Sequence, residues 1–191
     1  MSTDRHPSLI AATAYLTRGW QPVYVPAGKK APTAKEWEQK RYDPITAIPV
    51  WENGGNVGVQ TGPASNGLVD VDLDCPQSRA LADSCLPPTE SIFGRPGKPR
   101  SHRLYVADPC LERTRRYKDV GRNGTGDGET LVELRSTNSQ TVVPPSVHPS
   151  GEHIGWEREG SPATVDGRVL EQQVARVAAI TILARHWPDT G

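Results

Sequence analysis

The chain has 191 residues, 35% hydrophobic and 23% charged, and its 22 basic residues balance 22 acidic ones. This length fits one ordinary domain with a short appendage and excludes multidomain machinery. The zero net charge argues against a protein that coats polyanions with its whole surface, and no apolar run approaches the roughly 18 residues that cross a bilayer. We therefore expect a folded cytoplasmic protein that does not contact a membrane.

The first half of the sequence predicts a helix, short strands and one long loop. The expected elements, in chain order, are a helix at 8–18 with Ser8 as its N-cap, a strand at 20–25, a proline- and lysine-rich ordered loop at 26–49, strands at 56–60 and 68–74, and a short helix at 77–83. The tryptophans of this half, with Trp156, are expected mainly in the core rather than in a groove that stacks bases.

The second half predicts further strands and a closing helix. The expected elements are a Pro/Gly-rich loop at 86–100, a strand at 102–106, a basic stretch without a clear period that ends in a turn at 121–128, strands at 131–135 and 141–143, a turn at 148–151 before a strand at 154–156, and a helix at 166–187 with Leu170, Val174, Val177, Ile180 and Trp187 on one face. This order indicates an α+β fold with a mixed or antiparallel sheet, an N-terminal αβ unit and a C-terminal helix. We assign residues 1–162 to a single domain and 163–191 to the helix and tail.

The segment LVDVDLD at 68–74 is the first candidate site. Because side chains alternate along a strand, Asp70, Asp72 and Asp74 share one face and the apolar residues share the other. Carboxylates stacked about 7 Å apart raise one another's pKa, so the arrangement is costly unless a cation or solvent relieves it. A divalent metal is the expected relief, and an exposed face of solvated acids is the alternative because so short a motif is unspecific.

The segment LVELR at 131–135 adds a carboxylate in a similar apolar context. If the two strands are near neighbours, Asp72, Asp74 and Glu133 form the hard-oxygen site that Mg²⁺ or Mn²⁺ prefers, with room for two ions about 3.5–4 Å apart. Asp70 ranks below them as a metal ligand because it enters the strand earlier. Arg135 is either the salt-bridge partner of Glu133, which we favour, or a phosphate ligand.

Basic residues concentrate between positions 95 and 122, where nine Lys or Arg stand against three acids. Such a segment can hold a phosphate backbone in a protein of zero net charge. Within it, Arg100, Ser101 and His102 open a strand and can reach the triphosphate of a nucleotide. The candidate contacts to nucleic acid are Lys98, Arg113, Arg115, Arg116 and Lys118, with Lys29 and Lys30 from the first loop, for which ordinary solvation is the alternative.

Together these residues resemble the N-terminal domain of bifunctional DNA primase/polymerases, the prim-pol branch of the archaeo-eukaryotic primase superfamily. The resemblance covers nearly the whole chain, through 18–37, 56–76, 99–105 and 131–156. The three motifs of that superfamily look like Asp72-Leu73-Asp74, Ser101-His102 and Val132-Glu133. The chain departs from the pattern at one point, because Arg100 occupies the serine position of the SxH motif.

The resemblance implies an RNA-recognition-like primase sheet and two-metal nucleotidyl transfer. In this interpretation Asp72, Asp74 and Glu133 bind two Mg²⁺ or Mn²⁺ ions, and His102 contacts the phosphates of an incoming NTP or dNTP. We therefore predict a nucleotidyltransferase, a template-directed DNA primase/DNA polymerase that acts on single-stranded DNA. Its expected setting is phage or mobile-element replication, with a separate helicase as a possible partner. For His148, in PPSVHPSG at 144–151, the resemblance suggests a contact at the rim of the site.

Two other functions fit some of the same residues. A catalytically inactive nucleic-acid-binding replication module would keep the fold, and salt-dependent DNA binding without metal-dependent incorporation would identify it. A glycosyltransferase uses a DxD motif to hold a metal-bound nucleotide sugar, but that function leaves the basic segment unexplained. A P-loop NTPase is disfavoured because GRNGTGDG at 121–128 lacks the Lys-Ser/Thr pair.

Overall fold

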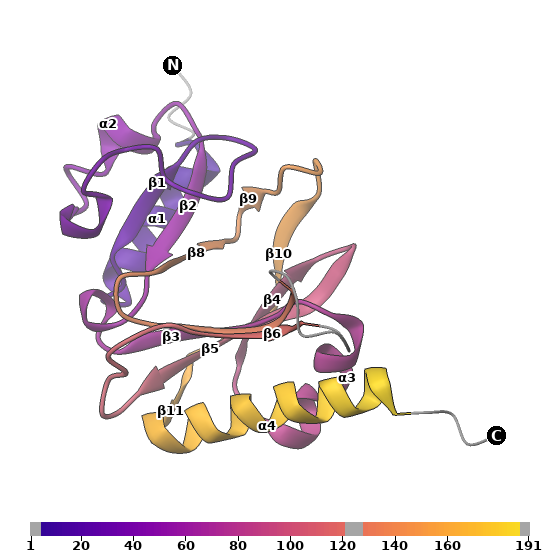
Figure 1. Ribbon diagram of the computed structural model, residues 1–191. Coiled ribbons are helices and arrows are strands. Elements are labelled where there is room, and N and C mark those ends of the chain that lie inside the picture. Colours follow the sequence, from indigo (N-terminus) through magenta and orange to yellow (C-terminus); the bar gives the residue numbers. More distant parts are fainter. Residues whose placement is uncertain (1–4, 121–127, 188–191) are drawn as a thin grey trace.

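A computed structural model describes residues 5–120 and 128–187 (Figure 1). Strands dominate, nearly all of them antiparallel, and they form two sheets with helices packed beside them, so the predicted α+β class is confirmed. Within the described residues, no helix has both the length and the apolar character that a membrane crossing requires. The turn predicted at 121–128 lies almost wholly outside these residues.

The larger sheet positions the candidate site. Its strands, in spatial order, are β6 (Arg115–Asp119), β7 (Glu129–Arg135), β3 (Leu68–Leu73), β5 (Lys98–Ala107), β4 (Ser91–Arg95), β10 (His153–Glu159) and β9 (Ser146–Val147), and β11 (Ala163–Val165) pairs with β5. All neighbours are antiparallel except β11, which runs parallel to β5. The strands with the predicted acidic residues, β3 and β7, are direct neighbours, as the metal hypothesis requires.

The smaller sheet contains β1 (Pro22–Val25), β2 (Asn56–Gln60) and β8 (Gln140–Val143), with β2 in the middle. The helices α1 (Pro7–Thr17) and α2 (Ile48–Trp51) belong to the same part of the fold. The predicted N-terminal αβ unit is therefore present, and it is completed by a strand from the second half of the chain. Because β8 follows β7 directly, the smaller sheet is tied to the edge of the acidic strands.

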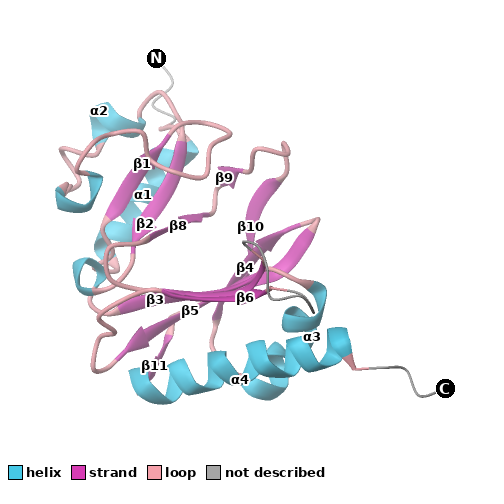
Figure 2. Cartoon of the chain, viewed as in Figure 1, coloured by secondary structure: helices cyan, strands magenta, loops and turns pink. Residues whose placement is uncertain are grey.

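Helices α3 (Pro76–Cys85) and α4 (Gly167–His186) cover one face of the larger sheet, and the smaller sheet with α1 lies beyond the other face (Figure 2). On β3, Val69, Val71 and Leu73 join the core under α3 and α4, as the alternation predicts. On the opposite face, Leu68 packs in a second core with residues of α1 and β2. This second face is therefore apolar at Leu68 and becomes acidic toward Asp72.

The structure confirms most of the apolar face that the sequence predicts for the closing helix, α4. Asp166 is the N-cap, and its carboxylate accepts hydrogen bonds from the amides of Arg168 and Val169 at 2.8 and 3.0 Å. Leu170, Val174 and Val177 are buried against the sheet. The predicted position of Trp187 on this face is wrong, because Trp187 follows the end of the helix and is 70% exposed. The boundary between 162 and 163 stays a prediction.

Four strands were not predicted, namely β4, β6, β9 and β11, and β4 lies where we expected a Pro/Gly-rich loop. Ile92 and Phe93 of β4 are buried, and Gly94 permits a bulge that the proline and glycine content conceals. A Cβ at Gly94 would lie 2.5 Å from the carbonyl oxygen of Lys98, so only glycine allows this close approach. The N-cap of α1 is also corrected, because the His6 side chain accepts from the Ser8 amide whereas the Ser8 hydroxyl donates to the carbonyl oxygen of Gly55.

Candidate active site

The candidate site is built on three adjacent strands. In the register of the larger sheet, Asp72 of β3 lies opposite His102 of β5 on one side and opposite Glu133 of β7 on the other. Asp70, two residues earlier, lies opposite Arg135. Directly opposed residues on one face of a sheet have their Cβ atoms about 4.5–5.5 Å apart. The strand order therefore brings these side chains into one row.

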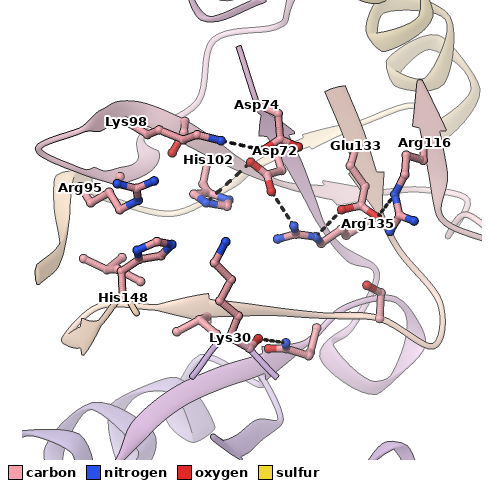
Figure 3. Close-up of a pocket in the computed structure, with 16 residues that line it drawn as sticks. Lys30, Asp72, Asp74, Arg95, Lys98, His102, Arg116, Glu133, Arg135 and His148 are labelled. Atoms are coloured by element: carbon pink, nitrogen blue, oxygen red, sulfur yellow. Dashed lines mark hydrogen bonds and ion pairs between the residues drawn. The ribbon is translucent and has the colours of Figure 1, made fainter. Parts of the chain in front are cut away.

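This row forms the floor of a hollow of about 260 Å³, which we call the acidic hollow (Figure 3). Its charged lining consists of Lys30, Asp72, Asp74, Arg95, Lys98, His102, Arg116, Glu133, Arg135 and His148. Lys30 and His148 face His102 and Arg135 from the opposite side in Figure 3. The hollow therefore lies between the larger sheet and segments associated with the smaller one.

His102 is held in one orientation by groups on two sides. Its Nδ1 lies 2.9 Å from Oδ2 of Asp70, whose side chain is fully buried. Its ring stacks on Phe93, with ring centroids 4.5 Å apart and planes inclined by 5°. The Nε2 atom is 3.8 Å from Oδ1 of Asp72. Since Nδ1 is engaged by Asp70, Nε2 is the ring nitrogen that remains for a contact in the hollow.

The charges around this imidazole shift two pKa values in opposite directions. Burial by itself would lower the pKa of His102, but the carboxylates of Asp72 and Asp70 outweigh it and raise that pKa. Burial would raise the pKa of Asp70, but the charges of His102 and Arg135 and the hydrogen bond from His102 outweigh burial and hold that pKa below its ordinary value. The pair therefore favours an ionised aspartate beside a protonated histidine.

Arg135 is the central cation of the row. Its Nη1 is 3.2 Å from Oδ2 of Asp70, its Nε donates to Oε2 of Glu133 at 3.0 Å, and its Nη2 donates to Asp72. Burial would lower the pKa of Arg135, but these three carboxylates raise it instead. The salt bridge to Glu133 that we favoured from the sequence is present, and it is one of three.

Each of the three proposed metal ligands has a cationic partner. Arg135 pairs with both Asp72 and Glu133, Arg116 donates to Glu133 from Nε at 3.1 Å, and Lys98 donates to Asp74 at 2.8 Å. In the part of the chain that the structure describes, no three His, Cys, Asp or Glu side chains are grouped to hold a metal ion. The oxygen donors nevertheless suit a hard divalent cation, and the guanidinium of Arg135 is a cation that bridges two of them. The donor set therefore fits a hard divalent cation, which Asp72, Asp74 and Glu133 would hold.

Most of the other predicted site residues also line the hollow. Ser101 is buried and contributes to its wall, and Lys30, Lys98 and Arg116 are among its charged residues. Asp70 lies beneath His102 and is not part of the lining, so its position favours an orienting contact over the possible metal role. The structure therefore brings His102, Ser101 and Arg135, three of the four predicted nucleotide contacts, to the acids.

Several predicted residues lie outside the hollow. Arg100 has a positive φ of 54° and pairs with Asp83 at 2.9 Å and Glu157 at 3.1 Å. These two acids hold its side chain outside the hollow, and its nucleotide contact stays a prediction. Arg115 pairs with Glu171 of α4 and so points to the other face of the sheet. Lys29, Arg113 and Lys118 also do not line the hollow.

The structure adds Arg95 and Gln140 to the predicted site and places His148 at it, where the resemblance suggested a rim contact. Arg95 comes from the unpredicted strand β4, and its ion pair with Glu152 holds it beside the β9–β10 hairpin. His148 comes from the turn of that hairpin, and burial together with the charges of Arg95 and Lys30 lowers its pKa. Arg95 could have been found only by recognising β4 within the Pro/Gly-rich stretch.

Lys30 differs from the other cations of the hollow. Within residues 5–120 and 128–187, no carboxylate lies within ion-pairing distance of its ammonium group. In Figure 3 this group points toward His102 and Arg135. A lysine without a counter-charge, facing a row of charged groups, can receive an anionic oxygen of a ligand.

Comparisons with known proteins support the same identification. A search of curated proteins finds no match. The sequence model of the bifunctional DNA primase/polymerase N-terminal family (Prim-Pol) matches residues 12–167, well over half of the chain. This range contains the acidic strands, the His102 strand and the hairpin with His148. The chain belongs to the bifunctional DNA primase/polymerase N-terminal family.

Proposed function

We propose that this protein is a template-directed DNA primase/polymerase that joins nucleotides on single-stranded DNA with the help of two Mg²⁺ or Mn²⁺ ions. The observation that supports this most strongly is the register of β3, β5 and β7, which sets Asp72 between His102 and Glu133. Family membership supports the DNA and nucleotide substrates. The geometry supports a reaction in which carboxylates and a positioned imidazole act on a phosphate.

In this proposal Asp72, Asp74 and Glu133 hold the metal ions. When bound, divalent ions supply Lewis acidity and charge neutralisation for phosphoryl transfer. The protein residues position and neutralise the remaining groups: His102, fixed by Asp70 and Phe93, offers Nε2 to a phosphate oxygen. Lys30, which has no carboxylate partner among the described residues, lies across the hollow from His102 and Arg135 and suits an oxygen of a triphosphate (Figure 3).

Arg135 has two roles in this proposal. Without metal, its guanidinium neutralises Asp72 and Glu133, which otherwise repel each other. With a divalent ion held by these acids, Arg135 would no longer be needed as their counter-ion and could donate to a phosphate oxygen. The bidentate geometry of arginine suits either partner. This combines the two alternatives that the sequence left open for Arg135.

The proposal also includes a setting in phage or mobile-element replication with a separate helicase as partner. It rests on the family resemblance, in which such domains commonly accompany a helicase.

One observation favours a second candidate, a catalytically inactive nucleic-acid-binding module. All three proposed metal ligands already have cationic partners, which is a stable arrangement without metal. In that case Arg135 would be a structural counter-ion. No contact in the hollow specifically favours the glycosyltransferase.

The test is nucleotide incorporation on unprimed and primed single-stranded DNA, with Mg²⁺ or Mn²⁺ and with NTPs or dNTPs in turn. The variant is Asp72→Asn, which keeps the size of the side chain, and the matched control is Glu52→Gln, which changes an exposed acid at the C-cap of α2. We expect a loss of at least about a hundredfold in Asp72→Asn and none in the control, the order expected for removing charge stabilisation of a transition state. Thermal unfolding should show that both variants remain folded.

Absence of metal-dependent incorporation in the wild type, together with DNA binding that weakens with salt, would identify the inactive module instead. Equal incorporation by wild type and Asp72→Asn would reject the assignment of the acids.

A further inference from the structure

The loop from Pro26 to Tyr42, which we call the 26–42 loop, is held in place by amide side chains of the smaller sheet. Asn56 donates to the carbonyl oxygen of Lys29 at 3.0 Å, and Gln140 donates to that of Lys30 at 2.8 Å. Gln60, which is buried, donates to the carbonyl oxygens of Trp37 and Lys40 at 3.2 and 3.0 Å. Side-chain anchors along its length give the loop a defined path over β2 and β8.

Three hollows follow this path and share lining residues. The acidic hollow contains Lys30 and Ser139. A smaller hollow of about 120 Å³ contains Ser139, Arg41 and Trp37. A third hollow of about 300 Å³ contains Trp37, Tyr24, Tyr42 and Lys40, and we call it the aromatic hollow. The acidic hollow and the smaller hollow share Ser139, and the smaller hollow and the aromatic hollow share Trp37, so the three lie next to one another from the acidic row to the aromatic side chains.

The charge of the 26–42 loop is positive and is not neutralised by acids. The loop contains five basic residues and two acidic ones. Within the described part of the chain, none of the five basic side chains has a carboxylate at ion-pairing distance. Each hollow is lined by one of them, namely Lys30, Arg41 and Lys40 in turn. Arg41 donates through Nη1 to the carbonyl oxygens of Glu38 and Lys40 and to the side-chain oxygen of Gln60, all of them neutral groups that leave its charge in place. Cations without a carboxylate partner along one loop match a chain of phosphates.

Trp37 is the aromatic residue that joins two of the hollows. We expected it in the core, but it is only half-buried and belongs to neither hydrophobic core, whereas Trp20 and Trp51 are buried. Tyr24 and Tyr42 pack on the side of the second core and form the rest of the aromatic wall. Exposed aromatic rings beside cations are the usual platform for unpaired bases.

We propose that single-stranded DNA follows the 26–42 loop from the acidic hollow to the aromatic hollow, with its phosphates on Arg41 and Lys40 and one base stacked on Trp37. The direction of the strand, with its reacting end at the acids, rests on the proposed function. The binding itself does not, because it requires neither metal nor catalysis. A base is an aromatic ligand that suits a hollow of about 300 Å³, at the lower end of ligand sites.

The experiment measures binding of a labelled 12-nucleotide oligothymidine by fluorescence anisotropy without metal. The variants are Trp37→Ala and Trp37→Phe, and the matched control is Trp187→Ala, which removes a 70% exposed tryptophan beyond the end of α4. We expect about a tenfold weaker binding for Trp37→Ala, largely restored in Trp37→Phe, and no change for Trp187→Ala. A second strand with an abasic backbone of the same length tests whether a base is the ligand: Trp37→Ala should lower its binding much less.

Two results would overturn the proposal: wild-type affinity of Trp37→Ala for the oligothymidine, or an equal loss on the oligothymidine and the abasic strand. Circular dichroism and thermal unfolding identify a variant that fails to fold, and in that case Trp37→Phe alone decides, by comparing its binding of the two strands. Trp37-dependent binding without incorporation would reject the proposed function and keep this inference. Incorporation with Trp37-independent binding would do the reverse.

Discussion

The basic segment 95–122 and the 26–42 loop both carry an excess of positive charge, but their side chains lie in different surroundings. Many basic residues of the segment form ion pairs with acids: Arg95 with Glu152, Lys98 with Asp74, Arg100 and Arg103 with Asp83, Arg115 with Glu171 and Arg116 with Glu133. In the described residues, the loop has five basic side chains and no such pair.

This difference shows that charge counted along a sequence is not the charge available to a ligand. The acids that neutralise the segment come from α3, α4, β7, the turn before β10 and the end of β3, most of them distant in sequence and close in the fold. An exposed ion pair contributes little to stability, but each partner removes a cation from the field that a polyanion meets. We therefore transfer the predicted contact to single-stranded DNA from the segment to the loop.

The largest expected effect separates these two regions directly. The double variant Lys40→Gln with Arg41→Gln removes two unpaired cations, and Arg100→Gln with Arg115→Gln removes two paired ones. Each released phosphate contact to single-stranded DNA contributes about 0.7 to the slope of log affinity against log salt. We expect the loop variant to lose about 1.4 of that slope, and about 25-fold of affinity near 0.1 M salt.

Titrations of labelled single-stranded DNA at several salt concentrations measure both quantities. The segment variant has the same net charge, so a general electrostatic effect would weaken both variants equally. An equal loss would return the contact to the whole basic surface and remove the distinction between the two regions.

The sequence predicted the parts of the fold in which apolar residues recur at a clear strand or helix period. The alternation of β3 and the helical spacing of Leu170, Val174 and Val177 correspond to buried faces in the structure. Strand β4 was missed because Gly94 and the prolines around it resemble a loop, whereas the strand is specified by its pairing with β5. Strand β6 was missed for a similar reason: it has basic residues on both faces and is specified by its partner β7. Long-range pairing of this kind leaves no local pattern.

The residues of the candidate site also fall into two groups, those with a local sequence pattern and those placed by long-range pairing. Asp72, Asp74 and Glu133 were found because they interrupt apolar strands at a fixed period. Arg95 and Gln140 were not found, because their approach to the acids depends on a hairpin and on the contact between the two sheets. The orienting position of Asp70 also required the register, which sets β3 beside β5 and brings its carboxylate to Nδ1 of His102.

A second prediction tests whether the paired cations of the segment are structural. Arg103 is buried, with 3% of its side chain exposed, and donates to Asp83 of α3 at 2.6 Å. Arg103→Gln removes this charged hydrogen bond from β5, and we expect a loss of about 1–2 kcal/mol in the free energy of unfolding. Urea unfolding measures it, with Arg113→Gln, a change at an exposed residue, as the control that should stay within about 0.5 kcal/mol of wild type.

The same variant should leave the affinity for single-stranded DNA and its salt slope unchanged, provided it is measured where the protein is fully folded. A reduced slope with unchanged stability would instead place Arg103 among the DNA contacts and weaken the contrast between the two regions.

The smallest expected effect concerns the pH dependence of this pair. The hydrogen bond from Arg103 is the largest cause that holds the pKa of Asp83 below its ordinary value, and the charges of Arg103 and Arg100 add to it. A carboxyl whose pKa is lowered by folding contributes stability above its unfolded pKa of about 3.9, and the contribution is lost as the pH falls through the folded pKa. The advantage of wild type over Arg103→Gln should therefore be constant from about pH 5 to 7 and smaller toward pH 3. Because Asp83 is 59% exposed, solvent screens the pair and the decrease is small.

Urea unfolding of wild type and Arg103→Gln across this pH range measures the difference in their free energies of unfolding. The contributions of the other titrating groups are the same in both proteins and cancel in this difference. A difference that stays constant down to pH 3 would mean that Arg103 stabilises the fold by packing alone, without its charge.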